Sequence, residues 1–309
     1  MGKKVTILSS RQTNKEIVSA IIELRETGQY MLKELLEAAG IAKSVFKYWN
    51  DRLSKAQGKD TEIVQQIREI VSQSRGRYGY RRVCLALKQR GWVVNHKKVL
   101  RLMRQYQLLC VKFKHRNRQY QSYKGKVGKI AGNKLTRRFN TDRPYQKVLT
   151  DVTQFNISAT GEKLYLSPFM DVYSGEILSY TIDRSPTLDI ALAPLEALVQ
   201  RRPVLDYRMT VHSDQGWHYQ HKRWVTYLEK HKIFQSMSRK GNCLDNAPME
   251  NFFGLLKQEM FYGQAFATYT ELEAAIHQYI DFYNNDRIKT KLKGMSPVNY
   301  RRHTFEDIA

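Results

Sequence analysis

The uneven distribution of charge along the chain is the feature that most constrains how it can fold. The 309 residues carry a formal net charge of +23. Residues 1–141 hold 32 Lys and Arg against 9 Asp and Glu, whereas residues 142–309 hold 20 of each. This asymmetry predicts a first half that binds a polyanion, joined to a second half with a different task. A membrane-surface or solubility role for the basic half is the alternative.

Cysteine usage and hydropathy narrow the class of protein further. Cys84, Cys110 and Cys243 are the three cysteines, and no CxxC pair occurs, so neither a disulfide framework nor a zinc cluster is predicted. No apolar run approaches the 18 residues of a membrane span, and residues 1–15 lack the apolar core of a signal peptide. We therefore expect a cytoplasmic protein with no membrane partner.

The first third of the chain has the apolar periodicity of helices. Apolar residues recur at helical spacing over 32–36 and again over 45–49, on either side of Gly40. A helix, a short glycine turn and a second helix are typical of the DNA-binding helix-turn-helix. Three helices that pack together without DNA would give the same pattern.

A helix-turn-helix is thus predicted over residues 1–58, and a second, similar helical unit over residues 59–110. The last helix of the second unit begins near Asn95, and its cations share a stripe opposite an apolar face. A solvated helix face is the alternative to phosphate contact. The cations predicted to contact DNA in the two units are Lys43, Lys47, Arg81, Arg82, Lys97, Arg101 and Arg104.

Residues 111–141 are predicted to form a basic linker. They contain ten Lys or Arg, no acid and little apolar material, so the free segment is expected to stay extended. Along a nucleic-acid backbone its charge would be neutralised. A solvated interdomain linker is the alternative.

After Asp142 the pattern changes from helices to strands. Three alternating runs, over 148–157, 163–175 and 176–183, predict an antiparallel meander. Helices then alternate with strands, which describes a mixed sheet with helices on it. The predicted fold class is therefore α + α/β, with helix-turn-helix units followed by a mixed α/β domain over residues 142–309.

Three acids of the second half are predicted to converge on one end of this sheet. Asp151 lies within the first strand, Asp214 ends the fourth strand, and Glu250 lies on the helix that begins at the sequence DNAP. Carboxylates at such positions are suitable ligands for Mg²⁺, and two ions can share three acids in a phosphodiester displacement. A strand-edge aspartate and a solvated helix face are the structural alternatives.

Glu250, Gly254 and Lys257 form one stripe of that helix, away from its apolar face. The glycine would let a DNA backbone approach, and the lysine would meet a phosphate. For any such stripe taken alone, a solvated face is the ordinary interpretation.

The spacing of these acids resembles that of a known family. Asp151, Asp214 and Glu250, with 35 residues between the last two, are similar to the catalytic triad of the DDE transposase and retroviral integrase superfamily. Lys257 matches the basic residue that the family carries seven positions after the glutamate. The sequences HSDQGWHYQ, SMSRKGNCLDNAPMENFFGLLK and YNNDRIKTKLKGMSPVNYR resemble the second-reading-frame product of bacterial insertion sequences of family three. GRYGYRRVCLALKQRGWVVNHKKVLRLM resembles that group's upstream helix-turn-helix segment.

The resemblance implies an RNase H-like core and an enzyme that nicks the ends of a mobile element and joins the 3′-hydroxyl to DNA. It implies two Mg²⁺ ions, with Mn²⁺ as an alternative, held by the three acids. The implied partners are double-stranded DNA, as terminal inverted repeats and target, further copies of the chain, and an upstream helix-turn-helix protein. The implied location is the bacterial cytoplasm, at the nucleoid.

The chain also departs from the family's pattern. Val148 and Leu149 stand where many relatives have tryptophan, and Lys289 stands where many have histidine. Asp171 is a fourth acid, with a supporting or structural role, and His212 is either a core residue or orients Asp214. A DNA-binding regulator without catalysis and an RNase H-type nuclease are the rival functions.

Overall fold

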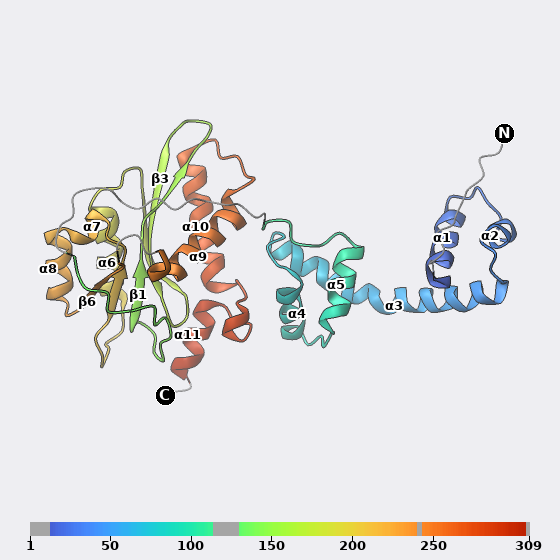
Figure 1. Ribbon diagram of the computed structural model, residues 1–309, viewed down its shortest axis with the longest axis horizontal. Coiled ribbons are helices and arrows are strands. Elements are labelled where there is room, and N and C mark those ends of the chain that lie inside the picture. Colours follow the sequence, from blue (N-terminus) through green and yellow to red (C-terminus); the bar gives the residue numbers. More distant parts are fainter. Residues whose placement is uncertain (1–12, 114–129, 240–242, 307–309) are drawn as a thin grey trace. The chain divides into compact units, whose positions relative to one another are not determined.

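The computed structural model describes residues 13–113, 130–239 and 243–306 (Figure 1). The chain divides into two compact units after Ile70. Within the three described ranges, no helix is both long enough and apolar enough to cross a membrane.

The first unit is built from helices α1 (Asn14–Glu26), α2 (Leu32–Ala39) and the beginning of α3 (Lys43–Gln73). Its core consists of Val18, Ile21, Leu35 and Phe46, packed together at the centre of the three helices. Gly40 ends α2 with a positive φ of 64°, a conformation that glycine adopts without strain. The structure thus has a helix, a turn at Gly40 and a second helix as expected, and the DNA-binding role of this unit stays a prediction.

Helix α3 differs from the expectation of a break near residue 58. It is one continuous helix of 31 residues, and the compact units divide after Ile70 instead. A single glycine inside a helix costs only about 1 kcal/mol relative to alanine. Ile63, Ile67 and Ile70 resume the helical spacing at once and are buried, which offsets that cost.

The second unit begins with two helices, α4 (Tyr80–Gln89) and α5 (His96–Gln105). Asn95 caps α5 through its side chain, which accepts a hydrogen bond of 2.8 Å from the backbone N–H of Lys97. The buried apolar residues of the pair are Val83, Ala86, Leu87, Val99, Leu102 and Met103. This is the amphipathic arrangement that the sequence predicts.

A six-stranded mixed sheet forms the centre of the second unit (Figure 1). Its strand order is β2-β3-β1-β5-β6, and β4 pairs with β3. Strand β3 is antiparallel to β1, β2 and β4, whereas β5 is parallel to both β1 and β6. The strands are β1 (Lys147–Thr150), β2 (Thr153–Asn156), β3 (Lys163–Asp171), β4 (Ile177–Asp183), β5 (Thr210–Ser213) and β6 (Phe234–Met237).

Successive residues of β1 enter two different hydrophobic clusters. Val148 packs with α6 (Asp189–Arg201) and α8 (Lys222–Lys230), and Leu149 packs with α9 (Ala247–Leu256) and α10 (Tyr269–Asn285). Both side chains are fully buried, so Val148 and Leu149 are core residues. The remaining helical elements are α7 (Trp217–Gln220), η1 (Cys243–Asn246), the π-helix η2 (Lys257–Phe261), η3 (Thr290–Leu292) and α11 (Pro297–Glu306).

The predicted strand over 148–157 is interrupted at Asp151 and Val152. Thr150 of β1 pairs with Phe169, and Thr153 of β2 pairs with Leu166, which is the same register against β3. Strands β1 and β2 are therefore one predicted strand with a gap between them. In that register Pro168 stands opposite Asp151, and a proline has no N–H for the ladder. Asp151 instead uses its carboxylate, which accepts the N–H of Val152 at 2.7 Å.

The end of the predicted linker packs on the sheet. Leu135 is buried, the backbone N–H of Lys134 donates to Ser236 Oγ at 2.9 Å, and that of Ala131 lies 3.4 Å from Met237 Sδ. This differs from an extended linker up to residue 141, because Leu135 supplies an apolar anchor. Residues 114–129 of the predicted linker lie outside the described residues.

Helix α4 contacts the C-terminal part of the second unit through Tyr78, just before its start. The Tyr78 hydroxyl donates to the carbonyl of Asp286 at 3.0 Å and accepts the N–H of Ile288 at 2.9 Å. Arg82 lies 3.6 Å from the carboxylate of Glu259. Arg82 is thus engaged inside the protein, which speaks against the DNA contact predicted for it.

Glu259 is buried, and its carboxylate has several partners. It accepts hydrogen bonds from Arg287 at 2.9 and 2.5 Å and from the Tyr279 hydroxyl at 3.0 Å. The side chain of Arg287 is also almost completely buried. Loss of one partner of such a pair leaves a buried charge without compensation.

We therefore expect Glu259→Gln to lower the free energy of unfolding by about 3–5 kcal/mol. Glu162→Gln is the matched control, since Glu162 pairs with Arg184 at the surface and should lose at most about 1 kcal/mol. Urea denaturation followed by circular dichroism measures both. Equal losses in the two variants would contradict a special role for the buried pair.

Candidate active site

The parallel pairing of β1 with β5 places two of the predicted acids side by side. Leu149 is in register with His212, and the two strands run in the same direction. Two residues further along each strand lie Asp151 and Asp214, so these aspartates occupy equivalent positions. Adjacent strands are about 4.8 Å apart. The two carboxylates therefore leave the sheet at the same edge.

Burial and charge repulsion act together on Asp151. Burial raises the pKa of its carboxyl well above the ordinary value, and the charges of Asp214 and Glu250 raise it further. The N–H of Val152 and the cation of Lys257 lower it in part. The charges of both Asp214 and Glu250 thus act on the Asp151 carboxyl.

Asp214 lies in a tight turn that requires a glycine. Its Oδ1 accepts the N–H of Gly216 at 2.8 Å, and a Cβ on Gly216 would come within 2.9 Å of the same oxygen. Any side chain there would displace the carboxylate. Burial raises the pKa of Asp214 as well, and the Gly216 N–H offsets part of this shift.

Glu250 reaches the site from the first turn of α9. The helix begins after Asn246 and has Pro248 in its first turn, as predicted. The Asn246 side chain does not cap the helix, however. Its Nδ2 donates to the carbonyl of Thr150 at 3.3 Å and so joins the start of α9 to the end of β1. Glu250 itself is exposed, and burial still raises the pKa of its carboxyl.

The donor chemistry of the three acids fits a hard divalent cation. All the donors are carboxylate oxygens, and a cation would relieve the repulsion that raises the pKa of Asp151. Over the described ranges, no three His, Cys, Asp or Glu side chains stand in a ready metal-binding geometry. The acids are therefore close enough to repel one another, without forming a closed ligand cage.

Lys257 does not lie on a solvated face. Its Nζ donates to Thr153 Oγ1 at 2.7 Å and to the carbonyl of Gln154 at 3.1 Å. The ammonium group lies 5.0 Å from the centre of the Phe155 ring. One turn earlier, Gly254 is exposed, and a Cβ there would meet no atom within 4 Å. Neither packing nor backbone conformation within the chain accounts for this glycine.

Asp171 and His212 belong to the interior of the protein. The Asp171 carboxylate accepts the N–H of Tyr145 at 3.0 Å and both the N–H and the hydroxyl of Ser174 at 3.0 and 2.8 Å. His212 uses both ring nitrogens, at 2.8 Å from Ser236 Oγ and 3.0 Å from Ser238 Oγ. Burial lowers the pKa of His212 to about 4, so the ring is neutral near pH 7. His212 is a core residue and does not orient Asp214.

Lys289, where the resemblance to the family led us to expect histidine, is partly buried. Its Nζ donates to the Tyr283 hydroxyl at 2.7 Å and to the carbonyl of Gly175 at 3.3 Å. Burial lowers the pKa of its ammonium group to about 7, and the nearby charge of Arg287 contributes. These contacts give Lys289 a place in the core that holds β3, β4 and α10 together.

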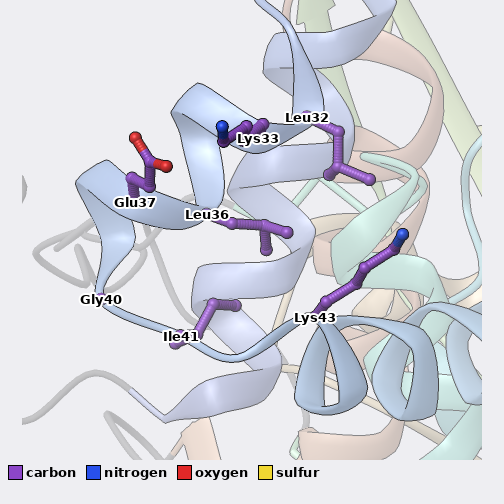
Figure 2. Close-up of a pocket in the computed structure, with 7 residues that line it drawn as sticks. All are labelled: Leu32, Lys33, Leu36, Glu37, Gly40, Ile41 and Lys43. Atoms are coloured by element: carbon purple, nitrogen blue, oxygen red, sulfur yellow. The ribbon is translucent and has the colours of Figure 1, made fainter.

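The cations of the helical units lie on exposed faces, with the exception of Arg82. Figure 2 shows Lys43 at the start of α3, beside a hollow lined by Leu32, Leu36 and Ile41. The other exposed cations are Lys47, Arg81, Lys97, Arg101 and Arg104. The last three form the predicted stripe on α5, and their contact with DNA stays a prediction.

Sequence reasoning missed the buried hydroxyl of Tyr219, on α7. Burial, followed by the charges of Asp151 and Asp214, raises the pKa of this phenol well above its ordinary value. The hydroxyls of Thr150 and Ser167 lie near it and act in the opposite direction. The sequence feature that could have pointed to this residue is its position five residues after Asp214, just beyond the turn at Gly216.

Profiles of known domain families match most of the chain. The integrase core domain matches residues 141–243 and 250–305, and an HTH-like domain matches residues 59–117. The solved catalytic core of HTLV-2 integrase is similar at 16% identity with a TM-score of 0.40, over 52% of this chain and 99% of that one. The matches to the domain profiles define the class of protein: an HTH-like domain followed by an integrase core domain.

Two named relatives extend over almost the whole chain. The putative transposase InsK of insertion element IS150, from Escherichia coli strain K12, is 44% identical over 92% of this chain and 97% of its own. The transposase InsF of insertion sequence IS3A, from the same strain, is 26% identical over 89% and 96%. The chain belongs to the family-three group of insertion-sequence transposases within the DDE superfamily, and it is a DNA transposase.

The raised pKa of Asp151 has a consequence for stability that can be measured without a reaction. A carboxyl whose pKa is raised by folding costs nothing while it is protonated in both states, below about pH 3.8. The cost grows as pH rises from there through the raised pKa, and each unit is worth about 1.4 kcal/mol. Asp151→Asn should thus increase Tm in EDTA at pH 7 by at least about 2–4 °C.

The difference in Tm between Asp151→Asn and the wild type should become smaller as the pH is lowered towards 4. Mg²⁺ should raise the Tm of the wild type more than that of the variant. Asp206→Asn is the control, because that carboxylate is exposed. Differential scanning calorimetry over the pH range gives all the values. A Tm difference that does not depend on pH would contradict the raised pKa of Asp151.

Proposed function

We propose that Asp151, Asp214 and Glu250 are the catalytic residues of this transposase. The observation that supports this most directly is the equivalent register of Asp151 and Asp214 on parallel strands, with Glu250 close enough to raise the pKa of Asp151. Their oxygens would hold two Mg²⁺ ions, or Mn²⁺ in their place. Bound there, the ions would activate the attacking oxygen and stabilise the leaving one.

The proposed reaction has two steps at the end of the mobile element. Water first cleaves one strand, and the 3′-hydroxyl released then attacks a phosphodiester of the target. The protein's own groups hold the carboxylates in place: the Gly216 N–H fixes one oxygen of Asp214, and the Val152 N–H fixes one of Asp151. The other oxygen of each aspartate is left to face the reaction.

The DNA would be held mainly by the basic helical units. The stripe of Lys97, Arg101 and Arg104 on α5 is exposed along its length and opposite a buried apolar face. Lys43, Lys47 and Arg81 would add phosphate contacts. We propose that these cations bind the terminal inverted repeats, that copies of the chain assemble on the DNA in the bacterial cytoplasm, and that an upstream helix-turn-helix protein assists.

Glu250→Gln tests the catalytic assignment. The change is nearly isosteric and lies on an exposed helical turn, so stability should change by less than about 0.5 kcal/mol. We expect normal binding of duplex DNA with loss of Mg²⁺-dependent nicking and of strand transfer from a pre-nicked end. The assay uses a supercoiled plasmid that carries the ends of the encoding element.

Glu229→Gln is the matched control, an exposed glutamate on α8 that should retain both steps. Loss of nicking alone in Glu250→Gln would restrict the role of Glu250 to water activation. Retention of both steps would remove Glu250 from the catalytic set. A wild-type protein that nicks without joining would be a nuclease, and one that only binds DNA would be a regulator.

Gly254→Ala tests whether DNA passes over the stripe between Glu250 and Lys257. Alanine is favoured over glycine in a helix by about 1 kcal/mol, and the added methyl group meets no atom of the chain within 4 Å. We therefore expect a more stable protein with slower strand transfer. Unfolding in urea and the plasmid assay measure the two effects. A stabilised variant with full activity would leave Gly254 without a role in DNA approach.

A further inference from the structure

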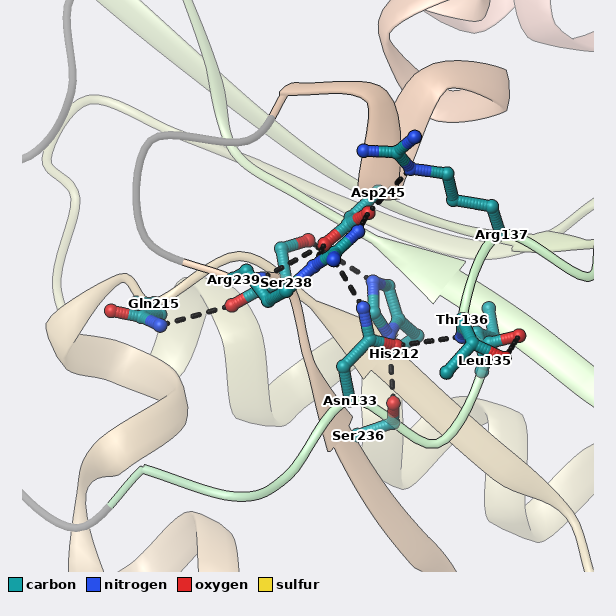
Figure 3. Close-up of polar contacts among 10 residues, drawn as sticks. All are labelled: Asn133, Leu135, Thr136, Arg137, His212, Gln215, Ser236, Ser238, Arg239 and Asp245. Carbon is teal, nitrogen blue, oxygen red and sulfur yellow. Dashed lines mark hydrogen bonds and ion pairs between the residues drawn. The ribbon is translucent and has the colours of Figure 1, made fainter.

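A second group of charges surrounds Asp245, next to the start of α9 (Figure 3). The Asp245 side chain is completely buried. It accepts bonds from Arg239 Nε and one terminal nitrogen, each at 2.9 Å, and from Arg137 Nε at 3.0 Å. The Arg239 N–H and the Asn133 side chain each donate to it at 3.0 Å. Hydrogen bonds from the arginines hold the pKa of Asp245 far below its usual range.

The two arginines face solvent, although their shared partner is buried. The side chains of Arg239 and Arg137 are 59% and 45% exposed. Two cations on one carboxylate leave a net positive charge. Arg137 contacts Asp245 through Nε, and Figure 3 shows its terminal nitrogens directed away from the cluster. A planar guanidinium with outward N–H groups in a fixed position is suited to a phosphate.

The position of the cluster connects it to the candidate active site on two sides. Gln215, which follows Asp214, donates from its side chain to the carbonyl of Ser238 at 3.0 Å, beside Arg239. Asn246, which follows Asp245, donates to the carbonyl of Thr150, beside Asp151. One side-chain hydrogen bond thus joins a neighbour of each aspartate to a neighbour of the charge cluster. A phosphate on the arginines would therefore lie close to the acids.

We propose that Arg137 and Arg239, held by Asp245, form a binding site for a DNA backbone phosphodiester at the edge of the active site. The proposal rests on the function proposed above and adds a DNA contact that joins Arg239, from the electrically neutral half of the chain, to Arg137 at the end of the basic half. It also gives the last part of the basic linker a direct role, because Arg137 lies within it. The linker would deliver one of the two guanidinium groups to the DNA.

A purely structural ion cluster is the competing explanation. Without Arg137, the buried Asp245 carboxylate still accepts hydrogen bonds from the Arg239 side chain, the Arg239 backbone N–H and Asn133. Arg137 is thus dispensable for satisfying the carboxylate. If the cluster is a phosphate site, replacing Arg137 must therefore weaken DNA binding and leave the stability of the fold almost unchanged.

The test measures the salt dependence of DNA binding in EDTA, with the full chain and a fluorescein-labelled duplex of random sequence. Each phosphate contact contributes about 0.9 to the slope of log K against log[salt]. We expect Arg137→Gln and Arg239→Gln each to lower the slope by about that amount. Arg143→Gln is the matched control, since Arg143 is exposed and pairs with Asp206, at the opposite end of β5 from Asp214.

Asp245→Asn separates the two explanations. It removes the shared negative charge but keeps both cations and a side-chain oxygen that can still accept a hydrogen bond from each of them, so a phosphate site predicts a slope at least as steep as that of the wild type. A structural cluster predicts that all three variants weaken binding together, or that the arginine variants bind like Arg143→Gln; either result overturns the proposal. Failure of wild-type nicking would instead overturn the proposed function, because the binding measurement needs neither metal nor reaction.

Discussion

The parallel pairing of β1 with β5 is the constraint on which the rest of the structure depends. Parallel strands end at the same edge of a sheet, so side chains at equivalent register positions are neighbours whatever their separation in sequence. Asp151 and Asp214 are 63 positions apart in the chain and equivalent in the register of Leu149 and His212. Every other element of the site is arranged around this pair: the glycine turn after β5, the gap between β1 and β2, and the helix that carries Glu250.

The gap after β1 coincides with the position of the proposed catalytic residue Asp151. Asp151 is a poor strand residue, and its neighbour on β3 is Pro168, which has no N–H to donate. The ladder therefore opens at the point where the carboxylate must leave it. The cost appears in two pKa values: burial and the charges of neighbouring acids raise the pKa of Asp151, and burial raises that of Asp214. Such local inconsistencies are expected at functional sites.

Helix α9 is fixed at both ends by buried acids that are not part of the catalytic set. Asp245 precedes it and joins it to Arg137 at the end of the linker and to Arg239, the second residue after β6, while Glu259 follows it and pairs with Arg287. Between these anchors the apolar face of α9 packs against the sheet, and Glu250, Gly254 and Lys257 occupy other positions on the helix. In the π-helical turn at Lys257–Phe261, the Lys257 side chain contacts Thr153 of β2, and the side chain of Glu259, two residues later, is buried in the core.

The sequence by itself determined the halves of the chain, the elements and the candidate acids, because these depend on local properties: net charge, the period of apolar residues, and glycine and proline at turns. It correctly predicted the turn at Gly40 and the start of α9. Tertiary structure alone decided the partners of polar side chains. In the folded protein Asp171 and His212 are core residues, and Arg82 lies beside Glu259. Helix α3 is continuous, and Arg137 and Arg239 share the carboxylate of Asp245. Such pairings join residues far apart in sequence, and only the folded backbone brings them within hydrogen-bonding distance.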